Sequence, residues 1–389
     1  MTAPAFLAEP GLAAVMAALP RARVVGGAVR DTLAGLAVAD IDLATPDLPG
    51  QVVASLRRAG LRAVPTGLAH GTVTALAGGR GYEVTTLRRD VATDGRHAVV
   101  AFTEDWREDA ARRDFTLNAL SMSGDGTVCD YFGGIEDLRA GRVRFVGDPA
   151  QRIAEDYLRI LRFFRFHARY GRTPPDPAAL SAIREGVPGL SRLSPERVWS
   201  ELRRILAGPD PRETVALMAS LSVLAAVLPE GADPARLGQA MPDDPLLRLA
   251  ALSTGDTEAA ADRLRLSNAD RARLVALRAG PTPRPENDDA TLRRLLADTP
   301  ADVLVGRVWL ADDGDAGRAA LRARLDGMER PVFPLAGRDV LPLGVLPGPE
   351  VGLLLDAVRR WWLEGGCVAN TEACAARLRA LIVERRDGA

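Results

Sequence analysis

The chain has 389 residues, too many for one compact core, so the sequence predicts several domains. Its net charge of −1 excludes a uniformly basic nucleic-acid-binding protein, and any surface for nucleic acid must therefore be local. The three cysteines lack the spacing of a zinc site, and no apolar run reaches the length of a bilayer span. We expect a cytoplasmic protein without membrane contact, and the sequence carries no signal of its oligomeric state.

The first 145 residues have the pattern of a mixed α/β region. Short runs rich in Val, Ile and Thr predict strands at 23–25, 40–44, 71–77, 82–87, 117–121 and 127–131. The pair Gly26-Gly27 predicts a tight turn, followed by a helix over 28–36. Residues 88–106 are polar and show no period, which predicts a mobile loop.

Beyond residue 148 the pattern changes to the helical period and strand signals almost vanish. We expect helices at 149–169, 177–185, 195–207, 211–227, 245–252, 255–264, 268–278 and 289–298. The predicted class is therefore α+β, with a small mixed-sheet head followed by helices only. We divide the chain into a head (1–145), a neck (146–207), a body (208–330) and a tail (331–389).

The strand predicted at 40–44 carries two carboxylates, Asp40 and Asp42. Residues two apart on a strand project to the same face, so both carboxylates point to one place while Ile41 packs behind. Carboxylates that close repel one another unless a cation lies between them, and magnesium prefers such oxygen ligands. The tripeptide alone is more typical of a turn or a helix cap.

The residues before this strand favour the chemical interpretation. Gly26-Gly27 lets backbone N–H groups approach a triphosphate at the start of a helix, and Arg30 follows one turn later. An arginine there can hold a phosphate with two parallel hydrogen bonds. A strand, a glycine turn, a helix with Arg and a strand with two aspartates together suit metal-assisted transfer of a nucleotidyl group.

The segment GGAVRDTLAGLAVADIDLAT (26–45) resembles the signature of the DNA polymerase β superfamily as it occurs in the tRNA nucleotidyltransferase and poly(A) polymerase family. The resemblance continues through GYEVTTLR (81–88), EDAARRDFTLNALSM (108–122), EDYLR (155–159) and LSPERVWSELRRIL (193–206). It covers about residues 20–207 and points to the class II CCA-adding enzymes of that family. The head is thus expected to have a DNA polymerase β-like fold.

Carried over onto this sequence, the resemblance implies two carboxylates that bind magnesium, Asp40 and Asp42. Glu83 lies where a third active-site carboxylate is expected, although a surface glutamate fits the pattern equally well. Gly27 and Arg30 match the triphosphate contacts. Arg113 matches a nucleotide contact, Arg112 could equally be a solvated helix residue, and Asp114 is expected to be a structural partner of an arginine or a helix cap.

The helix expected around 155–166 carries the motif EDYLR. By resemblance, Asp156 and Arg159 read the incoming base: the carboxylate accepts from an exocyclic amine, and the arginine donates to ring acceptors. Arg162 and Arg165 match positions that support this pair or the phosphates. The charges lie on one half of the helix and apolar residues on the other, which also describes an ordinary surface helix.

The resemblance implies an enzyme that adds C, C and A to the 3′ end of tRNA from CTP and ATP, without a nucleic-acid template and with Mg²⁺ as cofactor. The alternatives are a poly(A) polymerase, an enzyme that adds only A or only the two Cs, and a non-catalytic RNA-binding protein. Tail binding to tRNA is also expected from the resemblance. Trp361 and Trp362 are candidates for stacking, but neighbouring helix positions cannot both face one ligand, so one belongs to the core.

Overall fold

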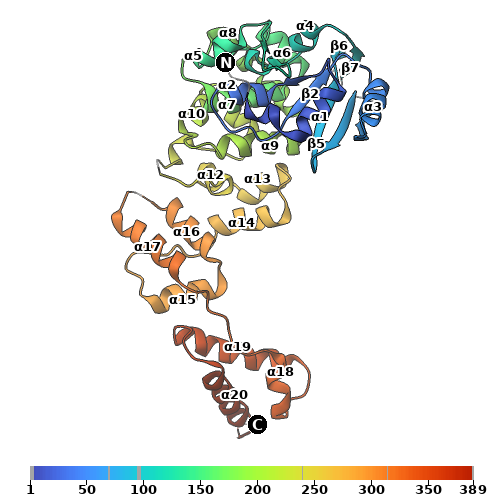
Figure 1. Cartoon of the computed structure of the whole chain (residues 1–389). Helices are drawn as coiled ribbons and strands as arrows, with labels where there is room; N and C mark the ends of the chain where they lie inside the picture. The colour runs from blue at the N-terminus through green and yellow to red at the C-terminus, as the bar shows by residue number, and fades with distance from the viewer. Residues whose placement is uncertain (1–3, 69–70, 94–97, 239, 313, 388–389) are drawn as a thin grey trace. The chain divides into compact units, whose positions relative to one another are not determined.

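The computed structural model describes residues 4–68, 71–93, 98–238, 240–312 and 314–387. The chain divides into two compact units, Met1–Pro234 and Ala235–Ala389, which run from blue to yellow-green and from yellow to red in Figure 1. The first unit combines a mixed sheet with helices, and the described part of the second is helical. The expected α+β class is therefore confirmed, whereas the finer division into neck, body and tail stays a prediction.

The sheet of the first unit has the strand order β3-β4-β5-β2-β1-β8-β9. Its strands are β1 (Arg23–Val25), β2 (Asp42–Thr45), β3 (Arg62–Gly67), β4 (Thr72–Ala77), β5 (Arg80–Thr86), β8 (Ser121–Met122) and β9 (Val128–Cys129). Neighbouring strands are antiparallel except β2 and β5, which run parallel. This one parallel contact pairs Asp42 with Glu83.

Helices α1 (Pro10–Ala18) and α3 (Pro49–Arg58) cover one face of this sheet (Figure 1). Apolar side chains alternate along the strands, so Val84 of β5 and Leu43 of β2 are buried beneath these helices. Their neighbours Glu83 and Asp42 consequently project from the opposite face.

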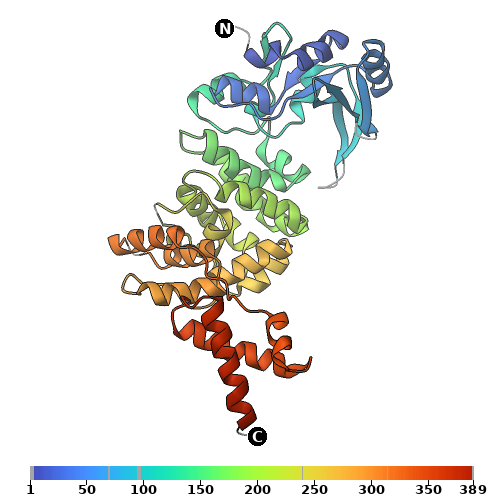
Figure 2. The same ribbon diagram turned by 60° about the horizontal axis from the view of Figure 1, so that its bottom comes forward.

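Most of the other elements of the first unit are helices. They are α2 (Gly27–Leu33), α4 (Trp106–Ala111), α5 (Gly134–Ala140), α6 (Pro149–Glu155), α7 (Leu158–Tyr170), α8 (Pro177–Gly186), α9 (Pro195–Leu206), α10 (Arg212–Ser220) and α11 (Val223–Val227). In Figure 2 the green helices gather on one side of the blue and cyan sheet. Phe163 and Phe164 of α7 are fully buried, and Phe163 stacks on Phe145, which anchors α7 to the segment that leaves the head.

Three expected elements of the head differ from the structure. Strand β2 begins at Asp42, so Asp40 precedes it, although Ile41 is still buried between two exposed aspartates. Residues 117–121 are not one strand, because Asn118 donates to Asp114 and holds the chain in a 3-10 turn, Thr116–Asn118. The expected loop at 88–106 contains a hairpin, β6 (Arg88–Thr93) with β7 (Ala98–Phe102).

Two helices expected to be continuous are broken. The one predicted at 149–169 divides into α6 and α7 because Asp156 is extended (φ −155°, ψ 106°) and its carboxylate accepts from the N–H of Leu158. The one predicted at 211–227 divides at Ser222, which has a left-handed φ of 62°.

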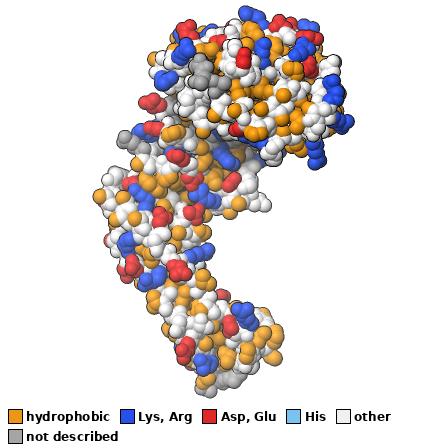
Figure 3. All heavy atoms as spheres, viewed as in Figure 1, with side chains coloured by type: hydrophobic (Ala, Val, Ile, Leu, Met, Phe, Trp, Pro, Cys, Tyr) orange, Lys and Arg blue, Asp and Glu red, His pale blue; other side chains and the backbone are white. Residues whose placement is uncertain are grey.

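The second unit contains α12 (Pro245–Leu252), α13 (Thr257–Arg263), α14 (Asn268–Arg278), α15 (Asp289–Asp298), α16 (Ala301–Leu310), α17 (Ala316–Gly327), α18 (Gly337–Val340), α19 (Pro349–Glu364) and α20 (Thr371–Asp387). Trp362 is buried in the core between α19 and α20, and Trp361 is partly exposed, as expected. Hydrophobic side chains also reach the surface between Val332 and Val383 (Figure 3). Within the described ranges, every helix is too short or too polar to cross a bilayer.

Candidate active site

A cleft of about 540 Å³ opens on the face of the sheet that α1 and α3 leave uncovered. Its wall is formed by β2, β5, the start of α2, the segment 109–118, α7 and α9, all within the first unit. Of the described residues, eight arginines line it: Arg30, Arg88, Arg112, Arg113, Arg159, Arg162, Arg165 and Arg197. Five carboxylates also line it: Asp42, Glu83, Asp109, Asp114 and Asp156. The excess of cations fits a polyanionic ligand.

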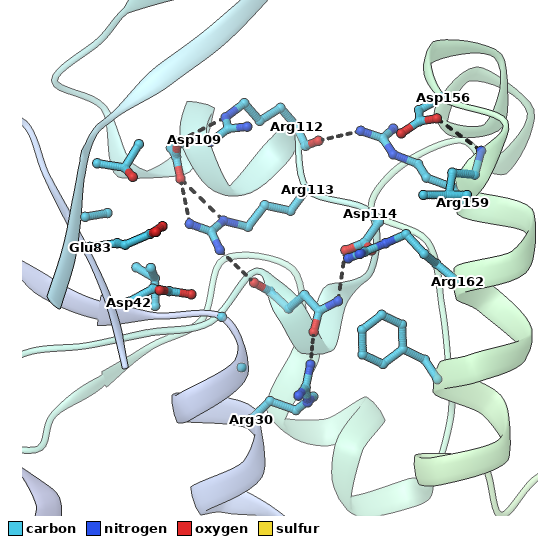
Figure 4. A pocket seen from close by; sticks show the side chains of 18 of the residues that line it. Arg30, Asp42, Glu83, Asp109, Arg112, Arg113, Asp114, Asp156, Arg159 and Arg162 are labelled. Atoms are coloured by element: carbon cyan, nitrogen blue, oxygen red, sulfur yellow. Dashed lines mark hydrogen bonds and ion pairs between the residues drawn. The ribbon is translucent and has the colours of Figure 1, made fainter. Parts of the chain in front are cut away.

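Two carboxylates, Asp42 and Glu83, meet at the sheet end of the cleft, and the charge of a third, Asp40, acts on Asp42. Asp42 and Glu83 are register partners and both point into the cleft (Figure 4). The side chain of Asp42 is exposed, yet the cleft walls partly desolvate its carboxylate, and this desolvation together with the charges of Glu83 and Asp40 raises the pKa of Asp42. Asp40 does not line the cleft but is near enough to act on Asp42. Mutual repulsion of this kind is relieved by a bound cation.

The carboxylates at this end of the cleft could bind magnesium together with the phosphates of a substrate. Among the residues that the structure describes, no three His, Cys, Asp or Glu side chains form a ready-made metal cluster. Magnesium usually binds proteins through one or two carboxylates, with substrate phosphates completing its shell. Asp40 and Asp42 beside a cationic cleft meet that description.

The glycine turn shapes the entrance to α2. Gly26 has φ 64° and ψ −119°, a conformation that favours glycine, and a Cβ on it would lie 3.2 Å from Nη1 of Arg113. A Cβ on Gly27 would lie 3.6 Å from Nη2 of Arg30. Glycine at 26 therefore leaves room for Arg113, whereas a Cβ at Gly27 would make only an ordinary van der Waals contact.

Arg30 is buried and held from several sides. Its Nε donates to Asp31 over 2.9 Å, and its Nη1 donates to Oδ1 of Asn118 over 2.6 Å. The guanidinium also lies over the rings of Phe166 and Tyr170, 5.0 and 4.8 Å from their centres. The hydroxyl of Tyr170 donates to Asp31, and burial together with this hydrogen bond raises the pKa of Tyr170 to about 12.

Arg112 and Arg113 share one buried carboxylate. Asp109 accepts from Nη2 of Arg112 at 2.8 Å and from Nη2 of Arg113 at 3.0 Å. Burial acts to raise the pKa of Asp109, but the two guanidinium charges outweigh it and lower the pKa. Arg112 is thus paired rather than solvated, and it donates in addition to the carbonyl of Arg88. Asp109 ties this arginine pair to the hairpin β6–β7.

Asp114 fulfils the expected structural role. Its Oδ2 accepts from Nε of Arg162 at 2.7 Å, and its Oδ1 accepts from Nδ2 of Asn118 at 2.9 Å. Burial acts to raise the pKa of Asp114. The charge of Arg162 and these hydrogen bonds outweigh burial and lower the pKa. Arg162, on α7, is thereby fixed to the head.

Asp156 and Arg159 both line the cleft at the break between α6 and α7, where the backbone N–H of Arg159 donates to the carbonyl of Asp156 at 3.0 Å, but their side chains have different partners. Oδ2 of Asp156 accepts from Nη2 of Arg197 on α9 at 2.7 Å, while Oδ1 caps α7. Arg159 pairs with Glu155 at 2.6 Å and donates to the carbonyl of Arg112 at 3.0 Å. The expectation that both side chains extend from one continuous helix is wrong, because Asp156 stands on extended backbone.

Arg165 completes this wall of the cleft. Its Nε donates to the buried Glu201 over 2.6 Å, and its guanidinium lies 4.2 Å from the centre of the Phe166 ring. Phe166 is thus in contact with three guanidinium groups, because Arg30 and Arg162 lie over it as well.

All of the expected site residues except Asp40 line one cleft. Sequence reasoning did not single out Asn118, Asp109, Arg197, Glu201 or Phe166, which hold the expected residues in place. Asn118 and Arg197 lie inside motifs that the resemblance already included, FTLNAL and LSPERVW. A polar residue in the otherwise apolar LNAL was the available signal for Asn118.

Comparison with known proteins gives consistent matches. Residues 22–144 match the model of the poly A polymerase head domain, and residues 175–233 match that of the probable RNA and SrmB-binding site of polymerase A. The mitochondrial CCA tRNA nucleotidyltransferase 1 of Homo sapiens is 36% identical over 365 residues, covering 88% of this chain and 83% of the human protein. Its counterpart in Danio rerio is 38% identical, with 87% and 83% covered. The structure resembles that of the Bacillus stearothermophilus CCA-adding enzyme in complex with CTP, at a TM-score of 0.75 and 27% identity, covering 98% of this chain and all of that one.

Proposed function

Because this chain belongs to the CCA tRNA nucleotidyltransferase family, we propose that it adds C, C and A to the 3′ end of tRNA from CTP and ATP, without a nucleic-acid template, and releases pyrophosphate. One observation carries the proposal: the cleft that contains Asp42 and Glu83 at its sheet end also contains Asp156 and Arg159 on its helical side. A nucleotide with its phosphates near the first pair has its base within the part lined by the second.

The catalytic residues are Asp40, Asp42 and Glu83, with Asp40 and Asp42 as the ligands of Mg²⁺. A bound magnesium ion supplies Lewis acidity at the α-phosphate and neutralises charge on the leaving pyrophosphate. The 3′-hydroxyl of the RNA attacks the α-phosphate while these carboxylates fix the site of attack. The raised pKa of Asp42 supports its assignment as a magnesium ligand, because a bound cation would offset the charges of Glu83 and Asp40 that raise it.

Gly27 and Arg30 bind the triphosphate, and Arg113 binds the nucleotide between the triphosphate and the carboxylates. Arg30 presents a guanidinium whose position is fixed by Asp31 and Asn118 before any ligand enters. A preorganised cation binds an anion without paying the entropy of ordering its own side chain.

Asp156 and Arg159 select the base. Asp156 accepts a hydrogen bond from the exocyclic amine that C and A share, and Arg159 donates to ring acceptors. Arg197 donates to Oδ2 of Asp156 at 2.7 Å, which orients the carboxylate. Arg162 and Arg165, on the next turns of α7, support this pair.

A poly(A) polymerase is the second candidate, because the head-domain model that matches residues 22–144 carries that name. Enzymes that add only A or only the two Cs share the same site chemistry. A non-catalytic RNA-binding protein is the least favoured alternative, since the carboxylate cluster has no function there.

The test uses purified protein, magnesium and each labelled nucleotide separately. With tRNA that ends before the CCA, we expect incorporation from CTP; with tRNA that ends in CC, we expect incorporation from ATP. UTP and GTP should give little product with either. Incorporation of ATP alone, into any RNA end, would favour the poly(A) polymerase, and no incorporation at all would favour the binding protein.

Two further assignments extend this proposal. We place the protein in the cytoplasm, because Cys129, Cys367 and Cys374 are all unpaired, as in a reducing compartment. Residues 331–389 are proposed to bind tRNA, with the partly exposed Trp361 as a stacking surface.

A further inference from the structure

Asn118 joins Arg30 on α2, through Asp114, to Arg162 on α7 by hydrogen bonds. It is buried, with 6% of its surface exposed, and ends the turn Thr116–Asn118. Its Oδ1 accepts from Nη1 of Arg30 at 2.6 Å, and its Nδ2 donates to Oδ1 of Asp114 at 2.9 Å. The other oxygen of Asp114 holds Arg162. Figure 4 shows the resulting chain of hydrogen bonds from Arg30 to Arg162.

The chemistry of this chain admits an amide and few other groups. A guanidinium only donates, so the atom facing Arg30 must be an acceptor. An ionised carboxylate only accepts, so the atom facing Asp114 must be a donor, and the lowered pKa of Asp114 keeps it ionised. Asparagine supplies one acceptor and one donor at this separation, whereas aspartate, alanine and leucine do not.

The backbone of the same residue reaches a third arginine. The carbonyl of Asn118 accepts from Nη1 of Arg113 at 3.3 Å. Arg30, Arg113 and, through Asp114, Arg162 are therefore all positioned relative to one short turn.

We propose that Asn118 is a positioning residue that sets the distance between the triphosphate contact Arg30 and Arg162 beside the base. The proposal rests on the proposed function of the cleft. It adds a residue that fixes the contact for the triphosphate relative to the contact for the base. Asn118 acts through these arginines and takes no part in the chemical step.

The isosteric variant Asn118→Asp provides the first test. When ionised, the new carboxylate repels Asp114; when protonated, it accepts from Arg30 and donates to Asp114 as the amide does. The charged groups around it are Arg30 and Asp31 on α2, Arg113 and Asp114 on its own segment, Arg162 on α7, and Asp137 on α5 behind Thr116. We therefore expect the ratio of kcat/KM for CTP, variant over wild type, to rise as the pH falls from about 8.5 to 5.5.

Two variants serve as controls for this pH profile. Asn118→Ala has no group to titrate, so its ratio should stay flat, about tenfold to a hundredfold below wild type with both CTP and ATP, the usual effect of losing a hydrogen bond to a charged group. Thr116 lies on the same turn as Asn118, but it does not line the cleft. Thr116→Val removes its buried hydrogen bond to Asp137 of α5, at 2.7 Å. It should keep kcat/KM close to wild type even if its Tm falls.

A double-mutant cycle gives the second measurement. Arg30→Lys and Arg162→Lys should be more strongly non-additive in kcat/KM in the wild-type background than in the Asn118→Ala background, where the shared contact with Phe166 still links the two arginines. A flat pH ratio for Asn118→Asp, or a coupling of the same size in Asn118→Ala as in wild type, would overturn the positioning role. A wild-type protein that adds no nucleotide to tRNA would instead overturn the proposed function.

Discussion

Glu83 lies directly beside Asp42, because β5 and β2 are the one parallel pair in the sheet and bring the two residues into register. Behind them the alternation of buried residues fixes both side chains on the cleft face. Partial desolvation, the charge of Glu83 and the charge of Asp40 all raise the pKa of Asp42. The fold thus assembles a negative cluster that is unfavourable by itself.

Removal of that charge separates activity from stability. In Asp42→Asn we expect kcat for both C and A addition to fall about a thousandfold or more, because a metal ligand is lost. A raised pKa in the folded state means that the contribution of Asp42 to stability is complete below its unfolded pKa and is lost as the pH rises through the folded value. At neutral pH and without metal, the variant should therefore unfold at the same or a higher temperature than wild type.

Thermal unfolding with and without magnesium checks this prediction. Magnesium should raise the Tm of wild type and of the control Glu136→Gln, an exposed acid on α5, but not that of Asp42→Asn. Substantial turnover by Asp42→Asn in magnesium would contradict the assignment.

Gly26 and Gly35 form a matched pair for testing the glycine turn. Both have positive φ, 64° and 71°, so an alanine at either costs about 1–3 kcal/mol of backbone strain. Only at Gly26 does the new methyl group meet a cleft residue, Nη1 of Arg113; at Gly35 nothing lies within 4 Å. Both variants should lose Tm, and only Gly26→Ala should show a higher KM for CTP and ATP. Equal kinetic losses would mean that strain alone, and not Arg113, explains the requirement.

Asp156→Ala tests base selection. Removing the acceptor for the exocyclic amine should weaken the discrimination against UTP and GTP. The ratio of kcat/KM for CTP over UTP should decrease by about tenfold to a hundredfold. Asp148→Ala is the control, because Asp148 caps α6 through the N–H of Gln151 and lies outside the cleft. It should lower the Tm with no change in that ratio. An unchanged ratio in folded Asp156→Ala would leave Asp156 as a helix cap only.

Asp114 makes the stability of the head sensitive to acid. Its folded pKa is lowered, so its contribution is present above the unfolded pKa of about 3.8 and is lost as the pH falls through the folded value. Asp114→Asn should reduce the free energy of unfolding at neutral pH by about 3 kcal/mol, since Arg162 loses its nearest carboxylate and keeps the more distant Glu201, at 4.0 Å. The free energy of unfolding, measured in urea from neutral to acid pH, should then decrease less steeply for the variant than for wild type. Parallel curves would contradict the ion pair.

Local patterns in the sequence predicted the elements whose contacts are local. The strand Arg23–Val25, the glycine turn after it and the alternation around Ile41 all follow from neighbouring residues, and the structure has them. The helical period likewise predicted α12 and α15 with their observed bounds. The roles of the cleft residues in catalysis stay predictions, although the structure brings most of them together.

The errors fall where side chains from distant segments decide the backbone. Asp156 ends α6 and caps α7 while Arg197, 41 residues away, holds its second oxygen. No period within 149–169 reveals that break, since the apolar pattern continues across it. Asn118 stabilises a turn where the sequence pattern predicted a strand. Its hydrogen bonds to Arg30 and Asp114 decide the backbone there, and the local pattern of apolar residues does not reveal them.

The proposed function requires one cleft to add three nucleotides in a fixed order. The decisive measurement is to incubate wild-type protein with tRNA that lacks CCA, in the presence of CTP and ATP together, and to sequence the 3′ ends over time. We expect successive products ending in C, CC and CCA, with no further growth after the A. A lengthening run of A, or products that stop permanently at C, CC or a single A, would contradict it.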